Sequence, residues 1–292
     1  LVVVLLGVTS SAWAQEGRQD ERILSFHSAI EIYPDSSMMV TETITVRSLG
    51  QSIRRGIYRD FPVRYGDLFD ERVVGFDVRK VLRDGDMESY YTEDKGDYVR
   101  VYIGKDDVFL EPGVYAYAIT YKTDRQLGYF EEYDELYWNV TGNGWEFPID
   151  EVRVDIKLPP GAEVIQYAGY TGNVDEKGED YEVNDWGDGM IRFETTRPLE
   201  TKEGLTVAVS WPKGLVTKPP FYTAPGFKSQ AAGAGGVVVV MLYYFIAWLL
   251  VGRDPRKGTI IPRYAPPKNV SPAAARYLMR MGFDQKSFAS AV

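Results

Sequence analysis

One stretch of the chain, Ser229–Gly252, constrains the fold more than any other because it contains no charged residue. Its centre, Val237–Val251, is apolar throughout, and Trp248 lies near one end, where aromatic residues collect at membrane interfaces. A bilayer core is ~30 Å thick and needs ~20 apolar residues in a helix, which satisfies its own backbone polar groups. The stretch therefore predicts a transmembrane helix over residues 236–251; the alternative is a buried helix of a soluble domain.

The charge of the chain is divided unevenly about this stretch. Residues 252–292 carry eight Lys or Arg against two Asp, a net charge of +6, whereas the whole chain carries −9. Residues 1–14 and 229–251 are uncharged, so residues 15–228 carry −15. Basic residues beside a span mark its cytoplasmic side, which predicts an acidic part outside and a basic segment inside. Like-charge repulsion argues against nucleic acid or anionic lipid as the partner of the acidic part.

The first residues resemble a secretory signal. Leu1–Val8 is a short apolar run, and Ala12-Trp13-Ala14 has the small-residue form that signal peptidase reads. We expect a signal peptide over residues 1–14, cleaved between Ala14 and Gln15. No basic region or initiator Met precedes the run, which indicates a segment clipped at its start. The alternative is a hydrophobic first strand.

The part between these two segments, residues 15–212, shows the alternation of apolar and polar residues that is typical of strands. It occurs over residues 23–33, 38–47, 74–82, 98–103, 115–121, 152–158, 191–193 and 205–211. Turn residues such as Asp84-Gly85 separate these stretches, and none of them has helical periodicity. We predict a mainly β extracytoplasmic domain, an antiparallel β-sandwich of one or two β units with a weak seam near Thr141–Ile149.

One acidic residue breaks the alternation. Glu42 falls on the apolar face of its predicted strand, where a charge needs a partner unless the strand lies at a sheet edge. The segment Arg54–Pro62 offers arginines around a glycine, and guanidinium pairs bidentately with carboxylates. Arg55 and Arg59 are therefore candidates for a structural ion pair with Glu42 or for an anion-binding site. The alternative is a solvated loop with ordinary surface arginines.

Aromatic residues surround a turn-like stretch within Tyr133–Pro148. Tyr137, Trp138 and Trp145 flank the turn and are candidate residues of a carbohydrate-stacking cleft. The alternative is that they are core aromatics beside a hairpin in which Asn143-Gly144 supplies the positive φ.

Acidic residues lie within the same region. A glycosidase needs a pair of carboxylates, which Glu131, Glu132, Asp134 and Glu135 could supply in a hydrolase site over residues 129–145. Acidic loops are common, and sequence spacing does not fix the distance between two carboxylates. The chain has no Cys and a single histidine, His27, which removes most zinc sites and all thiol nucleophiles. We therefore predict no metal, no cofactor and no catalytic residue.

Two further segments flank the predicted span. Residues 213–235 are rich in Pro, Gly and Ala and indicate a tether. Residues 252–292 form a basic cytosolic segment in which Ser271-Pro272 begins a short helix over Ala273–Met281 and Gly282 ends it. An extended stretch over Ile260–Pro267 precedes this helix, a second helix begins near Asp284, and we expect the natural protein to continue.

Three motifs together carry a resemblance to a known family. They are R-R-G-I-Y-R-D-F-P at 54–62, Y-W-N-V-T-G-N-G-W at 137–145, and G-R-D-P-R-K-G-T-I-I-P-R-Y-A-P-P at 252–267, followed by S-P-A-A-A-R-Y-L at 271–278. With the signal, the β domain and the span, the chain resembles the YciQ-like predicted bacterial membrane proteins, whose outer part is domain of unknown function 2207. The resemblance implies a continuation into a cytosolic helical domain and further spans. It brings no established reaction, cofactor or catalytic residue.

These observations predict a membrane-anchored envelope protein with a non-enzymatic interaction or sensing module outside the cytoplasm. The expected partners are the lipid bilayer and envelope proteins or glycans. Two alternatives stay open at this point: a glycan-active hydrolase that uses residues 129–145, and a structural subunit of a membrane complex.

Overall fold

The computed structural model describes residues 20–66, 72–253, 258, 268–282 and 284–286. The chain divides into two compact units, one up to Ala232 and one from Gly233 onward. No division falls near the seam considered at Thr141–Ile149, so the β domain belongs to one unit. The predicted signal peptide over residues 1–14, its cleavage site at Ala14 and Gln15, and the extended stretch at 260–267 lie outside the described residues.

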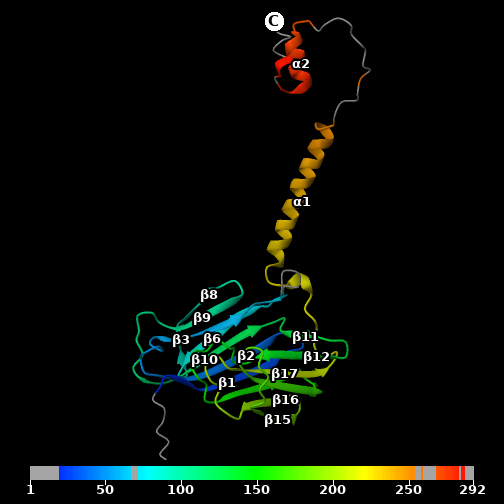
Figure 1. Cartoon of the computed structure of the whole chain (residues 1–292). Coiled ribbons are helices and arrows are strands. Elements are labelled where there is room, and N and C mark those ends of the chain that lie inside the picture. The colour runs from blue at the N-terminus through cyan, green and yellow to red at the C-terminus, as the bar shows by residue number, and fades with distance from the viewer. Residues whose placement is uncertain (1–19, 67–71, 254–257, 259–267, 283, 287–292) are drawn as a thin grey trace, which may run out of the picture. The chain divides into compact units, whose positions relative to one another are not determined.

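The first unit is mainly β, as the alternation predicts, and its largest sheet has eight strands in the order β15-β16-β13-β1-β2-β10-β6-β7 (Figure 1). The strands are β1 (Arg22–Ile32), β2 (Met38–Ser48), β6 (Phe76–Arg83), β7 (Asp86–Met87), β10 (Gly113–Thr123), β13 (Val152–Lys157), β15 (Tyr181–Gly187) and β16 (Met190–Thr195). The predicted turn at Asp84-Gly85 is confirmed between β6 and β7, since both residues have positive φ.

A second, four-stranded sheet has the order β11-β12-β17-β14, a third has the order β3-β9-β8, and β4 and β5 form a short ribbon. The strands are β11 (Leu127–Tyr129), β12 (Tyr133–Asn139), β17 (Gly204–Pro212), β14 (Gln166–Gly172), β3 (Gly56–Pro62), β9 (Tyr98–Gly104), β8 (Tyr90–Asp94), β4 (Arg64–Tyr65) and β5 (Arg72–Val73).

The expectation of purely antiparallel pairing is wrong at one place. β1 pairs with β13 in parallel, with Phe26 opposite Val152 and Ile30 opposite Ile156. In both strands, buried and partly exposed residues alternate. This alternation is the same whether two neighbouring strands run parallel or antiparallel, so it does not predict their relative direction. A parallel neighbour needs a long crossover rather than a hairpin, and here the crossover runs through β2 to β12.

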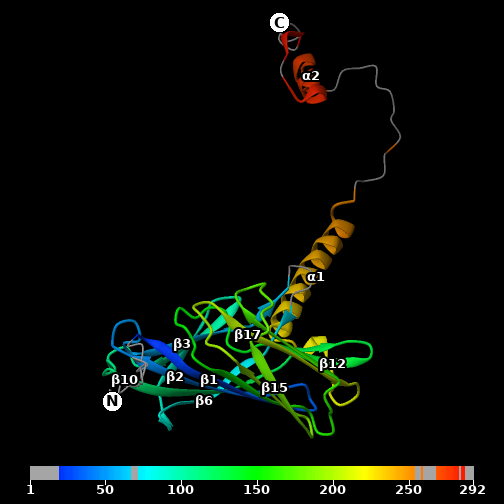
Figure 2. The same cartoon turned by 60° about the horizontal axis from the view of Figure 1, so that its bottom comes forward.

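The buried face of the large sheet is covered by the smaller sheets, and one hydrophobic cluster contains residues of all three (Figure 2). Phe61 on β3 contacts Phe76 on β6 and Tyr121 on β10, with ring centroids 4.5 and 4.7 Å apart. Tyr167 on β14 contacts Phe193 on β16 edge to face at 6.0 Å. The opposite face of β13 carries Arg153, Asp155 and Lys157 and is partly exposed.

The helix that contains the apolar stretch, α1, runs over Phe227–Leu250 and is long and apolar enough to cross a membrane. It is the only such helix among the described residues. It begins earlier than residue 236, so residues 227–235, predicted as part of the tether, are helical. Three of those residues are alanines, the best helix formers. Adding residues to an existing helix is favourable, so the apolar helix continues toward its N-terminus through them. A short 3₁₀ helix, η1 (Phe221–Thr223), precedes it.

The short helix of the inner tail is confirmed. α2 runs over Pro272–Arg280, the Ser271 side chain accepts a hydrogen bond from Ala274 N, and Pro272 occupies the first turn. The left-handed residue that ends the helix is Met281, with φ 50°, rather than Gly282. Most of the second helix expected near Asp284 lies outside the described residues.

The side chain of Glu21 stabilises the loop that leads from β2 to β3. Its carboxylate accepts hydrogen bonds from the backbone N–H groups of Leu49, Gln51, Ser52 and Ile53, at 2.6–3.1 Å. Burial by itself would raise the pKa of Glu21, but these four donors lower the pKa below its ordinary value.

We predict that Glu21→Ala lowers the free energy of unfolding by about 2 kcal/mol, because four donors lose a charged acceptor. A carboxyl whose folded pKa is lowered stabilises the fold above its unfolded pKa, so the wild-type advantage is present at pH 7 and is lost as the pH falls below about 4.5. Denaturant unfolding of both proteins at pH 7 and at pH 3.5 checks this. An equal difference at the two pH values contradicts the account.

Candidate functional site

A buried ion pair joins the large sheet to the three-stranded sheet. Glu42 lies in the middle of β2, on the face that it shares with Val40 and Ile44, and is fully buried. Arg59 lies in the middle of β3 and points the same way as Ile57, so strand alternation brings it over Glu42. Arg59 Nε donates to Glu42 Oε2 at 2.8 Å, and Nη2 donates to Oε1 at 3.1 Å. This bidentate geometry confirms that Arg59 is the partner of Glu42.

Two neighbours complete the environment of the pair. Tyr121 on β10 donates its hydroxyl hydrogen to Glu42 Oε1 at 3.0 Å, and Arg59 Nη2 also donates to Val140 O at 3.2 Å. Burial by itself would lower the pKa of Arg59, but the charge of Glu42 raises it above the ordinary value. Burial, followed by the charge of Glu42, raises the pKa of Tyr121 well above its ordinary value. Arg59 therefore stays a cation, and Tyr121 stays a neutral donor.

Arg55, the other candidate partner of Glu42, lies elsewhere. Its side chain is exposed and its guanidinium lies 4.4 Å from the ring centroid of Phe109. It precedes β3 and therefore does not share the inward face on which Arg59 lies. The ion-pair and binding predictions for Arg55 are not supported by this geometry.

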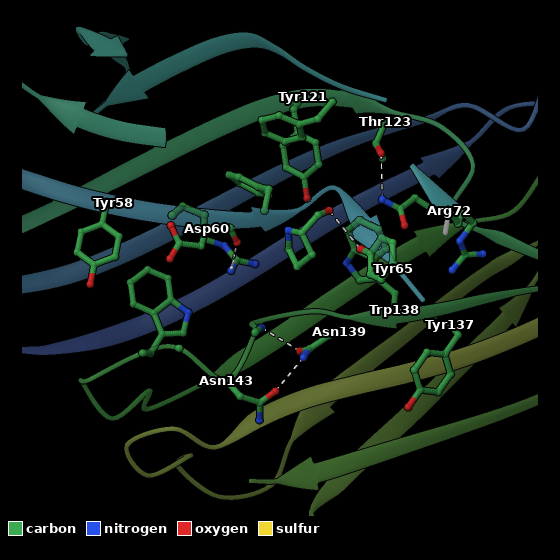
Figure 3. Close-up of a pocket in the computed structure, with 18 residues that line it drawn as sticks. Tyr58, Asp60, Tyr65, Arg72, Tyr121, Thr123, Tyr137, Trp138, Asn139 and Asn143 are labelled. Carbon is green, nitrogen blue, oxygen red and sulfur yellow. Dashed lines mark hydrogen bonds between the residues drawn. The ribbon is translucent and has the colours of Figure 1, made fainter. Parts of the chain in front are cut away.

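A cavity of about 360 Å³ opens beside the ion pair. It lies between β3 on one side and the end of β12 with the following loop on the other (Figure 3). Tyr58 and Arg72 lie at opposite ends of it in this view. The lining is formed mainly by aromatic, amide and charged side chains together with two glycines: Tyr58, Arg59, Asp60, Phe61, Pro62, Tyr65, Arg72, Phe76, Tyr121, Thr123, Gln126, Tyr137, Trp138, Asn139, Gly142, Asn143, Gly144 and Trp145.

The three predicted aromatic residues all line this cavity, which reconciles the two interpretations of them. Trp138 and Trp145 are half-buried, pack against the hydrophobic core and also face the cavity. Tyr137 is 60% exposed and lies at the rim. The residues are therefore both core aromatics and walls of a cleft.

Two donors at this cavity have hydrogen-bonding capacity left over. Arg59 Nη1 makes one long hydrogen bond, to Asp60 O at 3.3 Å, while Nε and Nη2 hold Glu42. The guanidinium is surrounded by the rings of Phe26, Phe61 and Trp145, at 5.0–5.9 Å from their centroids. Trp138 Nε1 is buried and has no hydrogen-bond partner among the described residues. A buried donor without a partner costs about 1–3 kcal/mol, which an acceptor atom of a ligand would recover.

The loop after β12 is held rigidly by its own amides. Asn139 Oδ1 accepts from Gly142 N at 2.9 Å, and Asn139 Nδ2 donates to Asn143 Oδ1 at 2.8 Å. Trp145 Nε1 donates to Thr141 O at 2.9 Å. The predicted Asn-Gly hairpin is wrong here, because the loop connects strands of two different sheets and its positive φ falls on Gly142.

The remaining acidic residues are placed unfavourably for a carboxylate pair in the cavity. Asp60 lines it but accepts two hydrogen bonds from Arg100, at 2.7 and 2.8 Å. Asp134 is buried and is paired with Lys213 at 2.6 Å. Neither Asp134 nor Glu131, Glu132 or Glu135 belongs to the lining. Among the described residues, no cluster of three or more His, Asp or Glu could hold a metal ion.

Sequence reasoning missed the amide and acidic part of the lining, Asp60, Gln126, Asn139 and Asn143. Asn139 and Asn143 lie within the aromatic stretch at 137–145. Their spacing around Gly142 is a sequence feature from which their place in the cavity could have been predicted. Gln126 and Asp60 come from distant parts of the chain, and only the fold brings them together.

Gly142 offers a sharp test of the loop geometry. Its φ is +73°, and a Cβ added there would lie 3.0 Å from Arg59 Nη1. We predict that Gly142→Ala costs about 1–2 kcal/mol of unfolding free energy, through backbone strain and displacement of the guanidinium. Gly144→Ala is the matched control, because nothing lies within 4 Å of its added Cβ. Equal unfolding midpoints for the two variants would show that the loop does not constrain Arg59.

Residues 22–211 match the family described as predicted membrane protein (DUF2207) N-terminal domain, and the match runs from the start of β1 into β17. The chain belongs to this family. Within it, the chain is 27% identical over 226 residues to the uncharacterized protein YciQ of Escherichia coli (strain K12). The aligned part covers 74% of this chain and 34% of YciQ, so the chain spans about a third of the length of its curated relative. This DUF2207 chain is therefore a membrane protein of a family whose function is unknown.

Solved structures show weaker likenesses to this DUF2207 chain. Native leukotriene A4 hydrolase from Saccharomyces cerevisiae is 11% identical with a TM-score of 0.39, over 66% of this chain and 30% of the hydrolase. An M1 zinc metallopeptidase from Deinococcus radiodurans is 13% identical with a TM-score of 0.37, over 64% of this chain and 42% of the peptidase. Likenesses at this level carry no argument about activity.

Proposed function

We propose that this protein is anchored by α1 with its acidic β domain outside the cytoplasm, and that this domain is a non-enzymatic interaction or sensing module. The orientation rests on the positive charge of residues 252–292 and the signal-like first residues. We include the sandwich architecture in this proposal, because the large sheet has one buried and one polar face and the smaller sheets pack on the buried one.

One observation carries the proposal of binding: an open cavity in which a buried, charge-compensated Arg59 presents a spare N–H among aromatic rings. Ligand sites are lined mostly by apolar and aromatic side chains with a few fixed polar groups, and this lining has that composition. The amides of Gln126, Asn139 and Asn143 can act as both donors and acceptors.

The ligand class follows from these groups. Aromatic walls suit a molecule with flat apolar faces, amides suit hydroxyl or acetamido groups, and Arg59 suits a carboxylate or carbonyl oxygen. A sugar with a carboxylate or an acetamido group has all three features. We therefore propose an acidic or N-acetylated saccharide of the envelope as the ligand.

Binding without hydrolysis is favoured by the acidic groups. Glycoside hydrolysis normally uses two carboxyl groups on either side of the scissile bond. The acidic residue in the described lining, Asp60, is held by Arg100, and the carboxylates of residues 131–135 lie outside the lining. The third possibility, a structural subunit of a membrane complex, has no specific observation in its favour.

Calorimetric titration of the full chain in neutral detergent tests this proposal. The probes are N-acetylated amino-sugar oligomers of equal length, with and without a carboxylate-bearing substituent. We expect both to bind and the acidic form to bind about 10-fold more tightly, because a charged hydrogen bond to Arg59 contributes about 1.5–3 kcal/mol. Absence of binding by either oligomer contradicts the proposal. Mass spectrometry of the recovered oligomers would reveal cleavage and so would support the hydrolase instead.

A further inference from the structure

A second pocket has a volume of about 270 Å³, and two of its residues, Lys218 and Pro219, shortly precede α1 in the sequence. It is lined by Arg72, Arg125, Leu127, Gly128, Tyr129 and Lys218, together with Pro219. Three of these residues are cations, and the described lining includes no carboxylate. This local excess of positive charge stands out in a domain whose net charge is −15.

The cations of this pocket are held by neutral groups. Arg125 Nη2 donates to Pro220 O at 2.7 Å and to Thr223 Oγ1 at 2.5 Å. Arg72 lies over the ring of Tyr65 at 5.3 Å, and Lys218 lies over the ring of Tyr129 at 5.4 Å. No carboxylate of the described residues forms an ion pair with any of the three. Their charges are therefore available to an anion.

Buried polar atoms of the same pocket also lack partners. Arg125 Nε and Tyr129 Oη are both buried without a hydrogen bond among the described residues. Such groups are rare in folded proteins, and each needs an explanation. Arg125 also has a φ of +60°, a left-handed conformation that an arginine adopts at a cost of about 1–2 kcal/mol. An anion with several acceptor oxygens, bound with a small shift of these two side chains, would supply the missing partners.

The covalent chain limits how far this pocket can lie from the start of α1. Arg125 is hydrogen-bonded to Thr223, and α1 begins at Phe227, so at most ~14 Å of chain separates the anchored residue from the helix. Phe221 and Tyr222 are 75% and 56% exposed, as aromatic residues at a membrane interface are. A cationic pocket joined to the span by so short a chain is within reach of the lipid headgroups.

We propose that this pocket binds a phosphate-bearing anion, and that the anion is the headgroup of an anionic lipid from the membrane that α1 crosses. Phosphate provides the multiple acceptor oxygens that Arg125, Tyr129 and Lys218 can reach together. The negative net charge of the domain, which argued against anionic lipid as its partner, does not describe this local surface. Arg72 lines both pockets, but Arg125 and Lys218 line only this one, so a variant of Lys218 tests this proposal separately from the saccharide cavity.

Titration of the full chain in neutral detergent with dioctanoyl phosphatidylglycerol tests the proposal, with dioctanoyl phosphatidylcholine and inorganic phosphate as the other probes. We expect phosphatidylglycerol to bind the wild type tightest. Lys218→Glu reverses one charge of the pocket and should weaken this binding about 20-fold. Lys80→Glu, an exposed lysine on β6, makes the same charge change and should leave the affinity unaltered.

The remaining outcomes overturn the proposal in distinguishable ways. Inorganic phosphate that binds as tightly as phosphatidylglycerol would assign the pocket to the free ion and exclude the lipid. If phosphatidylcholine binds as tightly as phosphatidylglycerol, the net negative charge of the lipid does not contribute to binding. If Lys218→Glu and Lys80→Glu weaken the binding of phosphatidylglycerol equally, the overall charge of the domain explains the affinity and the pocket does not. Circular dichroism of each variant verifies that its β structure is retained.

Discussion

Replacing Glu42 with glutamine is expected to lower the free energy of unfolding by about 3–5 kcal/mol, because Arg59 then remains a buried cation without a counter-ion. The guanidinium keeps its charge, so it cannot avoid the desolvation cost by losing a proton. The substitution preserves the size of the side chain, and the loss therefore reports the charge pair rather than a cavity.

Denaturant unfolding of the full chain, followed by tryptophan fluorescence, measures this effect. Glu93→Gln is the matched control: Glu93 lies on β8, is exposed and pairs with Lys95, and exposed pairs contribute little to stability because water screens them. The double variant Glu42→Leu with Arg59→Met should recover most of the loss, since apolar replacement of a whole buried pair is often neutral. A Glu42→Gln variant as stable as the Glu93→Gln control would contradict the account.

Replacing Trp138 with alanine is expected to weaken saccharide binding about 30-fold, which corresponds to about 2 kcal/mol. The side chain forms a wall of the cavity, and its Nε1 donor is buried without a hydrogen-bond partner among the described residues. The variant loses both the aromatic surface and this hydrogen bond.

Trp186→Ala is the control for this prediction. Trp186 lies on β15, is 54% exposed, contacts Arg192 and does not line the cavity. Its loss should leave the saccharide affinity within about twofold of the wild type. Unfolding of Trp138→Ala must be measured alongside, because the residue also packs against the core. Equal affinities of the two variants would show that the ligand binds elsewhere.

The strands were largely predictable from the sequence because alternation reports directly which residues face the core. Val40, Glu42 and Ile44 share the buried face of β2 as the pattern indicates, and the anomalous charge of Glu42 pointed correctly to a buried partner. The direction of β13 beside β1 was not predictable, since alternation is the same in parallel and antiparallel neighbours. Pairing is decided by the connections, which are long here.

The choice between Arg55 and Arg59 required recognising β3 as a strand. Ile57, Arg59 and Phe61 alternate inward, so this signal was present but was obscured by the arginines and Gly56 around it. The alternative prediction, a solvated loop with surface arginines, holds only for Arg54 and Arg55, which are exposed.

The cavity could be predicted only in part. Three of its aromatic residues come from the stretch at 137–145, whereas Asp60 comes from β3, Thr123 from the end of β10 and Gln126 from the loop that follows β10. The sequence left a structural ion pair and an anion-binding site as alternatives for the arginines. In the structure Arg59 belongs to both, because two of its nitrogens hold Glu42 while the third lies at the cavity.

Hydrogen exchange of the full chain with and without the acidic saccharide, read out by mass spectrometry, tests the central claim most directly. A bound ligand stabilises the elements that it contacts against local opening. We predict slower exchange over residues 58–65 and 137–145 and unchanged exchange over residues 181–192. Unchanged exchange in the first two segments at a saturating concentration of saccharide would contradict the assignment of this cavity as the binding site.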